Sequence, residues 1–163
     1  QRVTELLEMS GAEVIVTRNS DTALADNKRD DIYKRAEIAQ NSKASIFLTI
    51  QANSIPNPKW HGAQVFYHPD SMEGFRLADN VQREIIRVLQ NTDRVALPIK
   101  TVYLLNHLEI PSVVVEVGFL SNPAEEQALT EEDYQNRMAW SIYNGIVNYF
   151  AGDPAATQPV PAK

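Results

Sequence analysis

One acidic residue, Glu116, interrupts an apolar run and is the first candidate for chemistry. The run Val113-Val114-Val115-Glu116-Val117-Gly118-Phe119-Leu120 predicts a strand covered on both faces. A buried carboxylate without a partner is strongly disfavoured or shifts its pKa upward, so it usually has a catalytic task, a metal or a cation beside it. The alternative to a catalytic Glu116 is a structural ion pair with an arginine such as Arg18 or Arg35.

A second group of polar residues follows the apolar run Phe47-Leu48-Thr49-Ile50, which also predicts a buried strand. The residues that follow it are Gln51-Ala52-Asn53-Ser54. In open α/β sheets ligands bind beyond the carboxyl ends of the strands. Gln51 and Asn53 are therefore candidate site residues.

The remaining candidates are three histidines and a tryptophan. His61, His68 and His107 are not spaced at i, i+2 or i+4, so the sequence contains no local metal-binding motif, and each one alone is typical of a loop or surface histidine. Trp60 lies in the Pro-rich segment 54–62. It is either a platform on which a sugar or peptide stacks or a lid over the core.

The elements that must position these residues follow from hydrophobic periodicity. Helical and strand patterns alternate, which predicts a three-layer α/β/α fold with a twisted, mainly parallel sheet. Asn122-Pro123 has the form of a helix N-cap followed by N1, and Thr130 with Asp133 resembles a capping box. We expect helices at about 3–10, 30–41, 73–90, from 123 and over 134–149, and strands at 12–18, 47–50, 63–67, 102–105 and 113–120.

Composition limits the class of protein. The chain has 163 residues, of which 44% are hydrophobic and 22% charged, as expected for one globular domain. A net charge of −6 argues against nucleic acid as the main partner, because few cations would neutralise phosphates. No segment has the length and hydrophobicity of a transmembrane span, and there is no cysteine for disulfides or thiolate chemistry.

The two ends of the sequence differ from its middle. Residues 1–10 show a helical face without an N-cap, so we expect the chain to begin inside a helix and to lack preceding structure. From Ala151 the composition changes to Pro, Ala, Gly, Thr and Gln. We therefore expect a catalytic domain over residues 1–150 and a disordered tail over residues 151–163.

Several stretches together resemble one family, the zinc-dependent N-acetylmuramoyl-L-alanine amidases, and within it the CwlD-like cortex amidases of spore-forming bacteria. The resemblance covers the chain up to Phe150, and its most specific piece is Glu116-Val117-Gly118-Phe119-Leu120-Ser121-Asn122. The other stretches are 16–18 with Asp21, Arg35 with 38–39, 46–54, Ser54-Ile55-Pro56, Lys59-Trp60, Gly62-Ala63-Gln64, Phe66-Tyr67, Pro111 and 139–149.

The resemblance implies a function and a set of roles. The family cleaves the amide between N-acetylmuramic acid and the L-alanine of the peptidoglycan stem peptide, outside the cytoplasm in the cell wall or spore cortex. It implies that Glu116 acts beside the metal-bound water, that Asn53 and Trp60 contact substrate, and that Gln51 occupies the position of a histidine ligand of zinc. The first strand, its loop and the other two ligands would precede Gln1, so the domain would be incomplete, and a partner protein or an N-terminal fragment would complete the sheet.

The glutamine at position 51 leaves two interpretations. The neutral amide oxygen of glutamine is a poor zinc ligand beside imidazole, so we expect Zn²⁺, the cofactor of the family, to be absent from this chain and the chain to be inactive as written. In the first interpretation the chain is an amidase catalytic domain in a disabled form. In the second it is a non-catalytic module that binds peptidoglycan or a partner. The first is favoured because a binding module has little physical reason to keep a carboxylate between valines.

Overall fold

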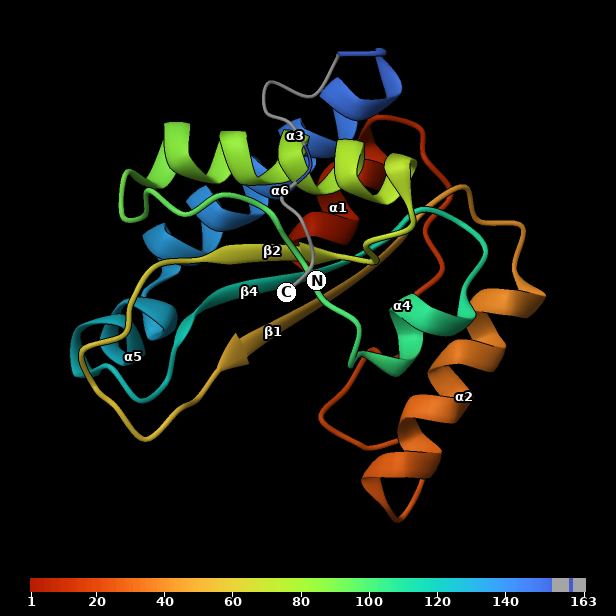
Figure 1. Cartoon of the computed structure of the whole chain (residues 1–163), viewed down its shortest axis with the longest axis horizontal. Helices are drawn as coiled ribbons and strands as arrows, with labels where there is room; N and C mark the ends of the chain where they lie inside the picture. Colours follow the sequence, from red (N-terminus) through yellow and green to blue (C-terminus); the bar gives the residue numbers. More distant parts are fainter. Residues whose placement is uncertain (154–158, 160–163) are drawn as a thin grey trace.

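The computed structural model describes residues 1–153 and residue 159 and shows three layers (Figure 1). A central twisted sheet has the strand order β1-β4-β2-β3. β1 pairs parallel with β4, β2 antiparallel with β4, and β3 parallel with β2. The strands are β1 (Phe47–Asn53), β2 (Gln64–Tyr67), β3 (Leu97–Pro98) and β4 (Ser112–Phe119). The predicted α/β/α fold with a mainly parallel sheet is confirmed.

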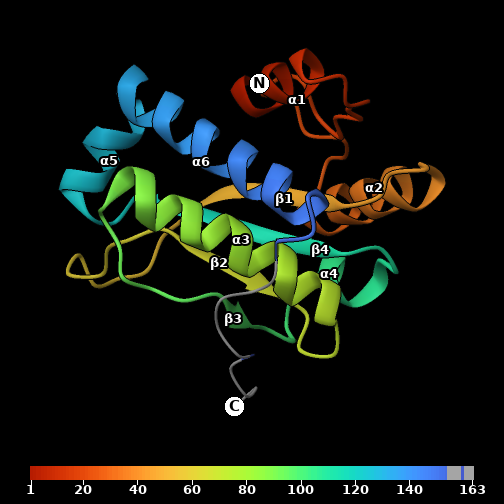
Figure 2. The same ribbon diagram turned by 90° about the horizontal axis from the view of Figure 1, so that it is seen from above.

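Helices cover both faces of this sheet (Figures 1 and 2). One face carries α3 (Met72–Leu89), α6 (Glu132–Phe150) and, beyond α6, α1 (Arg2–Met9). The other carries α2 (Lys28–Asn41) and α4 (Tyr103–His107). α5 (Pro123–Thr130) follows β4 directly at the carboxyl end of that strand.

The main core lies between the sheet and the pair α3 and α6. Val113 and Val115 of β4 belong to it, together with the apolar stripe of α3 that the 3.6-residue period predicts. The two helices approach closely at Gly145, where a Cβ atom would lie 2.5 Å from the Cα atom of Val81. The closely packed pair α3 and α6 therefore forms the layer that supports β4, the strand that carries Glu116.

Two predicted strands are absent. Val102–Leu105 contributes instead to the short helix α4, in which the Asn106 N–H donates to the Val102 carbonyl at 3.2 Å. Leu104 and Leu105 are buried, and Leu104 packs with Ala36 and Ala39 of α2. An apolar run of four residues cannot by itself distinguish a strand from a buried helical turn, and tertiary packing decides here.

The segment 12–18 is irregular and belongs to no strand. Its β-branched residues have no ladder partner, and Ile15 and Val16 are 48% and 50% exposed. A groove of about 1400 Å³ is lined by this segment, by residues 46–50 of β1 and its approach, and by α1 and α6. β1 is an edge strand, and Ile50 is 47% exposed although its sequence is that of a buried strand.

The helix ends show which local signals hold. The Asn122 side chain caps α5 by accepting from the N–H groups of Ala124 and Glu125, as predicted. The capping box predicted at Thr130 and Asp133 is wrong. The N-cap of α6 is Glu131, whose side chain makes no capping hydrogen bond, and the Thr130 hydroxyl donates to the Gln127 carbonyl instead.

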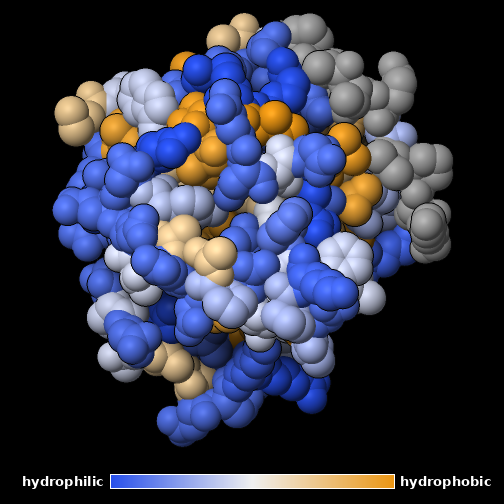
Figure 3. Space-filling model, turned by 90° about the vertical axis from the view of Figure 1, so that its left-hand side faces the viewer, coloured by the Kyte–Doolittle hydropathy of each residue, from blue (hydrophilic) through white to orange (hydrophobic). Residues whose placement is uncertain are grey.

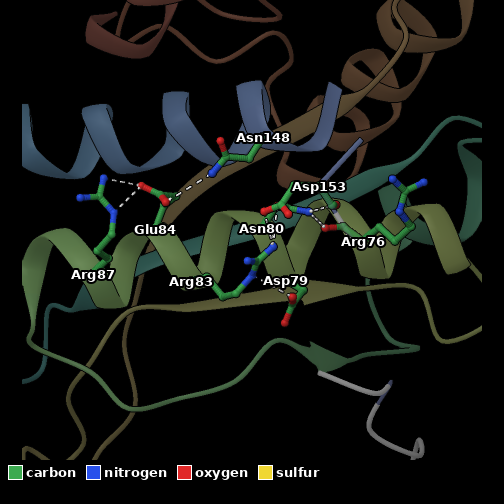
Figure 4. Close-up of polar contacts among 8 residues, drawn as sticks. All are labelled: Arg76, Asp79, Asn80, Arg83, Glu84, Arg87, Asn148 and Asp153. Carbon is green, nitrogen blue, oxygen red and sulfur yellow. Dashed lines mark hydrogen bonds and ion pairs between the residues drawn. The ribbon is translucent and has the colours of Figure 1, made fainter. Parts of the chain in front are cut away.

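The C-terminal end of the described chain is held against α3 (Figure 4). Asp153 accepts from Arg83 at 3.0 Å, and the same guanidinium donates to Asp79 at 3.1 Å. Nearby, Glu84 joins α3 to α6 by accepting from Asn148. Residues 151–153 thus form a turn on α3. The rest of the predicted disordered tail, except Pro159, lies outside the described residues.

No helix within the described ranges has the length and hydrophobicity needed to cross a membrane.

Candidate functional site

A row of three polar side chains crosses the sheet toward the carboxyl ends of β1 and β4. Glu116 of β4 is in register with Gln51 of β1 on one side and with Gln64 of β2 on the other. Cross-strand partners project to the same face of a sheet, so the three side chains lie side by side. The sheet therefore brings together Gln51 and Glu116, which are far apart in sequence.

Two amides of β1 hold the Glu116 carboxylate. The Gln51 Nε2 donates to Oε1 at 3.4 Å, and the Asn53 Nδ2 donates to Oε2 in a close contact. A shift of register between Gln51 and Asn53 lets both side chains reach the same carboxylate from one strand. Asn53 is fixed in turn because its carbonyl accepts the Leu120 N–H at 2.8 Å.

Burial raises the pKa of the Glu116 carboxyl above its ordinary value. The hydrogen bonds from Asn53 and Gln51, and the positive charge of Arg94, act in the opposite direction. A carboxylate with a raised pKa is a stronger base than one in water. The Glu116 carboxylate is thus a partly buried proton acceptor whose orientation is fixed by hydrogen bonds.

The structural alternative for Glu116, an ion pair with Arg18 or Arg35, is wrong. Arg35 pairs with Asp31 of its own helix at 2.6 Å. None of the ion pairs among residues 1–153 and 159 involves Glu116. The carboxylate is held by neutral amides rather than neutralised by a contacting cation.

The loop that carries Trp60 is fastened to the turn after β4. Asn122 donates to the carbonyl of Pro58 at 2.9 Å, and the Glu125 carboxylate accepts the N–H of Gly62 at 2.9 Å. Glu125 also accepts the N–H of Phe119, the last residue of β4, at 2.8 Å. The same buried carboxylate therefore ties the Trp60 loop to the strand of Glu116.

Gly62 is required where this loop passes close to its neighbour. Its φ is +92°, in the left-handed region, and a Cβ atom would lie 2.7 Å from the Thr92 hydroxyl. Trp60 itself is 48% exposed. This exposure agrees with a platform at the surface and not with a lid that closes the core.

The face formed by these carboxyl ends is mainly hydrophilic (Figure 3). Hydrophobic residues gather in its upper part, on the side of the sheet that α3 and α6 cover. A polar ligand is the kind of molecule that such a face accommodates.

The histidines do not form a metal centre. His68 accepts the Asp70 N–H through Nδ1, and His107 stacks on Tyr103 with ring centroids 3.8 Å apart. No group of three or more His, Cys, Asp or Glu side chains with the geometry for a metal occurs in the part of the chain that the structure describes. Beside Glu116 the donors are the amides of Gln51 and Asn53, so the residues present do not fit a catalytic zinc, which needs three firm ligands.

Three residues of the site were not predicted as such. Gln64 is predicted as part of a strand and of a stretch that resembles the family, with no role in the site. Glu125 occupies an ordinary acidic position in the first turn of α5, and Arg94 lies in the loop before β3. Their contacts join residues about 30 to 60 positions apart, for example Arg94 to Gln64 and Glu125 to Gly62. No local pattern in the sequence signals them.

The fold and this cluster define an α/β domain with a carboxylate-centred site at the carboxyl edge of its sheet. A family model described as N-acetylmuramoyl-L-alanine amidase matches residues 1–148. The chain belongs to the N-acetylmuramoyl-L-alanine amidase family, whose members hydrolyse peptidoglycan and use zinc. The resemblance stated from the sequence is confirmed.

Individual relatives agree with this assignment. The chain is 41% identical to the germination-specific N-acetylmuramoyl-L-alanine amidase of Bacillus subtilis, over 94% of this chain and 69% of that protein. It is similar to the CwlD amidase of Clostridioides difficile, solved in complex with the GerS lipoprotein, with 38% identity, a TM-score of 0.88 and coverage of 93% of this chain and 82% of that one. The catalytic domain of CwlV from Bacillus (Paenibacillus) polymyxa var. colistinus gives 30% identity and a TM-score of 0.81, over 92% and 79% of the two chains.

Proposed function

We propose that this domain acts on the amide between N-acetylmuramic acid and the L-alanine of the stem peptide, in the cell wall or spore cortex. The observation that carries the proposal is the partly buried Glu116 carboxylate, held by Asn53 and Gln51 and free of a contacting arginine, in a chain of the amidase family. Asn53 and Trp60 contact the substrate in this proposal. The similarity to a relative named as a germination-specific amidase and to the CwlD amidase supports this setting.

In the hydrolysis, Glu116 would move one proton. It accepts that proton from the attacking water and donates it to the nitrogen of L-alanine as the C–N bond breaks. The products are the lactyl carboxylate of muramic acid and the free amine of the peptide. Asn53 keeps the carboxylate aimed, because its Nδ2 donates to Oε2 while the backbone of Asn53 is fixed by Leu120.

The proposal includes that this chain does not bind the zinc that the family uses. The zinc of the family would supply Lewis-acid activation of the amide, but the donors around Glu116 do not fit it. As it stands, this chain would bind the muramoyl peptide and hydrolyse it slowly or not at all. The alternative is a binding module without catalytic function. In that case the domain would release no amine even after its zinc ligands were restored.

Ligand binding tests the proposed substrate class. We expect N-acetylmuramoyl-L-alanyl-D-glutamate to bind this chain and Trp60→Ala to weaken binding about two- to tenfold, the effect of losing one aromatic contact of about 0.5–1.5 kcal/mol. Trp140→Ala is the matched control, since Trp140 is 46% exposed on α6 and pairs with Tyr143 there. Calorimetry measures both. Equal losses for the two variants, or no binding by the unchanged chain, would remove the support for a site at Trp60.

The open edge of β1 supports a further part of the proposal, a strand supplied by a partner protein or by an N-terminal fragment. The Phe47 N–H donates toward β4, to the Pro111 carbonyl, so by alternation the N–H and C=O groups of Leu48 and Ile50 face the groove. These groups and the apolar lining match an extended apolar strand.

Without such a strand, we expect this chain to associate with itself as its concentration rises. Ile50→Lys should reduce the association, because a lysine at an edge strand opposes further strand pairing. Met72→Lys, at a residue 61% exposed at the start of α3, controls for the added charge. Light scattering that shows a monomer at all concentrations would argue against strand pairing at the open edge of β1.

A further inference from the structure

Arg94 is held rigidly beside the candidate site. Its Nε donates to the His61 carbonyl and its Nη1 to the Gln64 Oε1, each at 2.9 Å. Its guanidinium carbon lies 5.3 Å from the ring centroid of Trp60 and 5.5 Å from that of Phe119. A guanidinium fixed by two hydrogen bonds and two rings loses little further freedom when it binds a ligand.

This fixed cation is not neutralised by a contacting carboxylate within the described residues. None of the ion pairs found there includes Arg94. A guanidinium has five N–H donors, and the two hydrogen bonds to His61 and Gln64 use two of them. The remaining donors are available to an anion, and the side chain is only partly buried.

The position of Arg94 relative to Glu116 sets which part of a ligand it would meet. Gln64, to which Arg94 is bonded, is the register partner of Glu116 on the adjacent strand. Neighbouring strands lie about 4.8 Å apart, and the guanidinium bonded to Gln64 is close enough to Glu116 for its positive charge to lower the pKa of that carboxyl. An extended peptide advances about 3.3–3.6 Å per residue. A ligand whose scissile amide lies at Glu116 and whose peptide runs toward β2 would therefore present a residue that follows L-alanine to Arg94.

Building on the proposed function, we propose that Arg94 is a specificity-determining residue that binds a carboxylate of the stem peptide next to L-alanine. In peptidoglycan the residue after L-alanine is a D-glutamate unit, whose carboxyl group is either free or amidated. Arginine matches a carboxylate through charge-assisted hydrogen bonds. A local cation is needed here because the protein carries a net charge of −6 and would otherwise repel an anionic peptide.

A pair of ligands that differ only in charge tests the proposal. The probes are N-acetylmuramoyl-L-alanyl-D-glutamate and the same compound with both glutamate carboxyl groups amidated. We expect the unchanged chain to bind the acid about ten- to a hundredfold more tightly than the diamide, as for a hydrogen bond to a charged group. The preference should shrink as salt is added, because the site is partly exposed.

Substitutions separate recognition from support of the loop. Arg94→Gln should abolish the preference for the acid while the diamide keeps most of its affinity, and Arg94→Lys should retain part of the preference because it keeps the charge. Arg87→Gln makes the same change of charge at a residue of α3 that pairs with Glu84, and should leave the preference intact. Calorimetry gives all the affinities, and an NMR spectrum of each variant reports its fold.

The outcomes distinguish this proposal from the proposed function. If the unchanged chain binds acid and diamide equally, the role of Arg94 is wrong and the proposed substrate class stands. If Arg94→Gln weakens both ligands by the same factor, Arg94 only supports the Trp60 loop, and the proposal is overturned. If neither ligand binds the unchanged chain, both proposals fail together.

Discussion

Glu116→Gln is expected to lower turnover by about 10²- to 10⁴-fold in a zinc-competent form of this domain, one that has histidine at position 51 and the remaining ligands of the family. The reason is that glutamine keeps the shape of the side chain and one oxygen that can accept from Asn53, but it cannot accept or deliver a proton. The measurement is the release of the L-alanine amine from a muramoyl peptide. Bound zinc should remain nearly unchanged, since Glu116 is not assigned as a ligand.

The same substitution makes a separate prediction for the chain as it stands. Burial raises the folded pKa of Glu116 above its unfolded value, so between these two values the folded state holds more protons than the unfolded state. Stability therefore falls as pH rises through this window, and the penalty is fully present above the folded pKa. Glu116→Gln should raise the melting temperature at neutral pH, and the gain should vanish below the unfolded pKa.

A structural role for Glu116 would produce the opposite pattern. The neighbouring cation whose charge acts on the pKa of Glu116 is Arg94. If the carboxylate mainly compensates this cation, Glu116→Gln would lower the melting temperature and leave turnover per folded molecule near normal. Glu84→Gln, on α3, is a control for loss of an acidic side chain that accepts from Arg87 and Asn148 away from the site. An active but destabilised Glu116→Gln protein would end the catalytic assignment.

Much of the scaffold could be predicted because its signals are local. The apolar stripe of α3, the valine run of β4 and the cap at Asn122 each depend on neighbours within a few positions. Such periodic and capping signals survive tertiary packing when they agree with it. For the same reason the half-buried state of Glu116 could be inferred from its flanking residues alone.

The errors arise where a distant partner decides the outcome. The strand predicted over residues 12–18 needs a neighbouring strand, and the structure places a groove beside it. The run at Val102 becomes helical because Leu104 packs against α2. Arg94 reaches the site through contacts with His61 and Gln64, which no spacing in the sequence reveals.

The glutamine at position 51 leads to the second large expected effect, on zinc. We expect this chain, loaded with zinc and then dialysed against metal-free buffer, to retain much less than one zinc per molecule, because an amide oxygen is a weak ligand and the described residues offer no group of three suitable donors. Elemental analysis measures the metal. The melting temperature should also be insensitive to micromolar zinc, since a metal that binds only the folded state would raise it.

Gln51→His should increase zinc retention, because it places an imidazole beside the Glu116 carboxylate, its register partner on β4. The matched control is Gln40→His, which adds a histidine at an exposed amide of α2 that donates to the His107 carbonyl. If both variants gain zinc equally, the added metal is bound nonspecifically and position 51 has no special place. One chelator-sensitive zinc per molecule of the unchanged chain would show that donors other than Gln51 complete a site, and His61→Ala would then test whether the loop histidine is one of them.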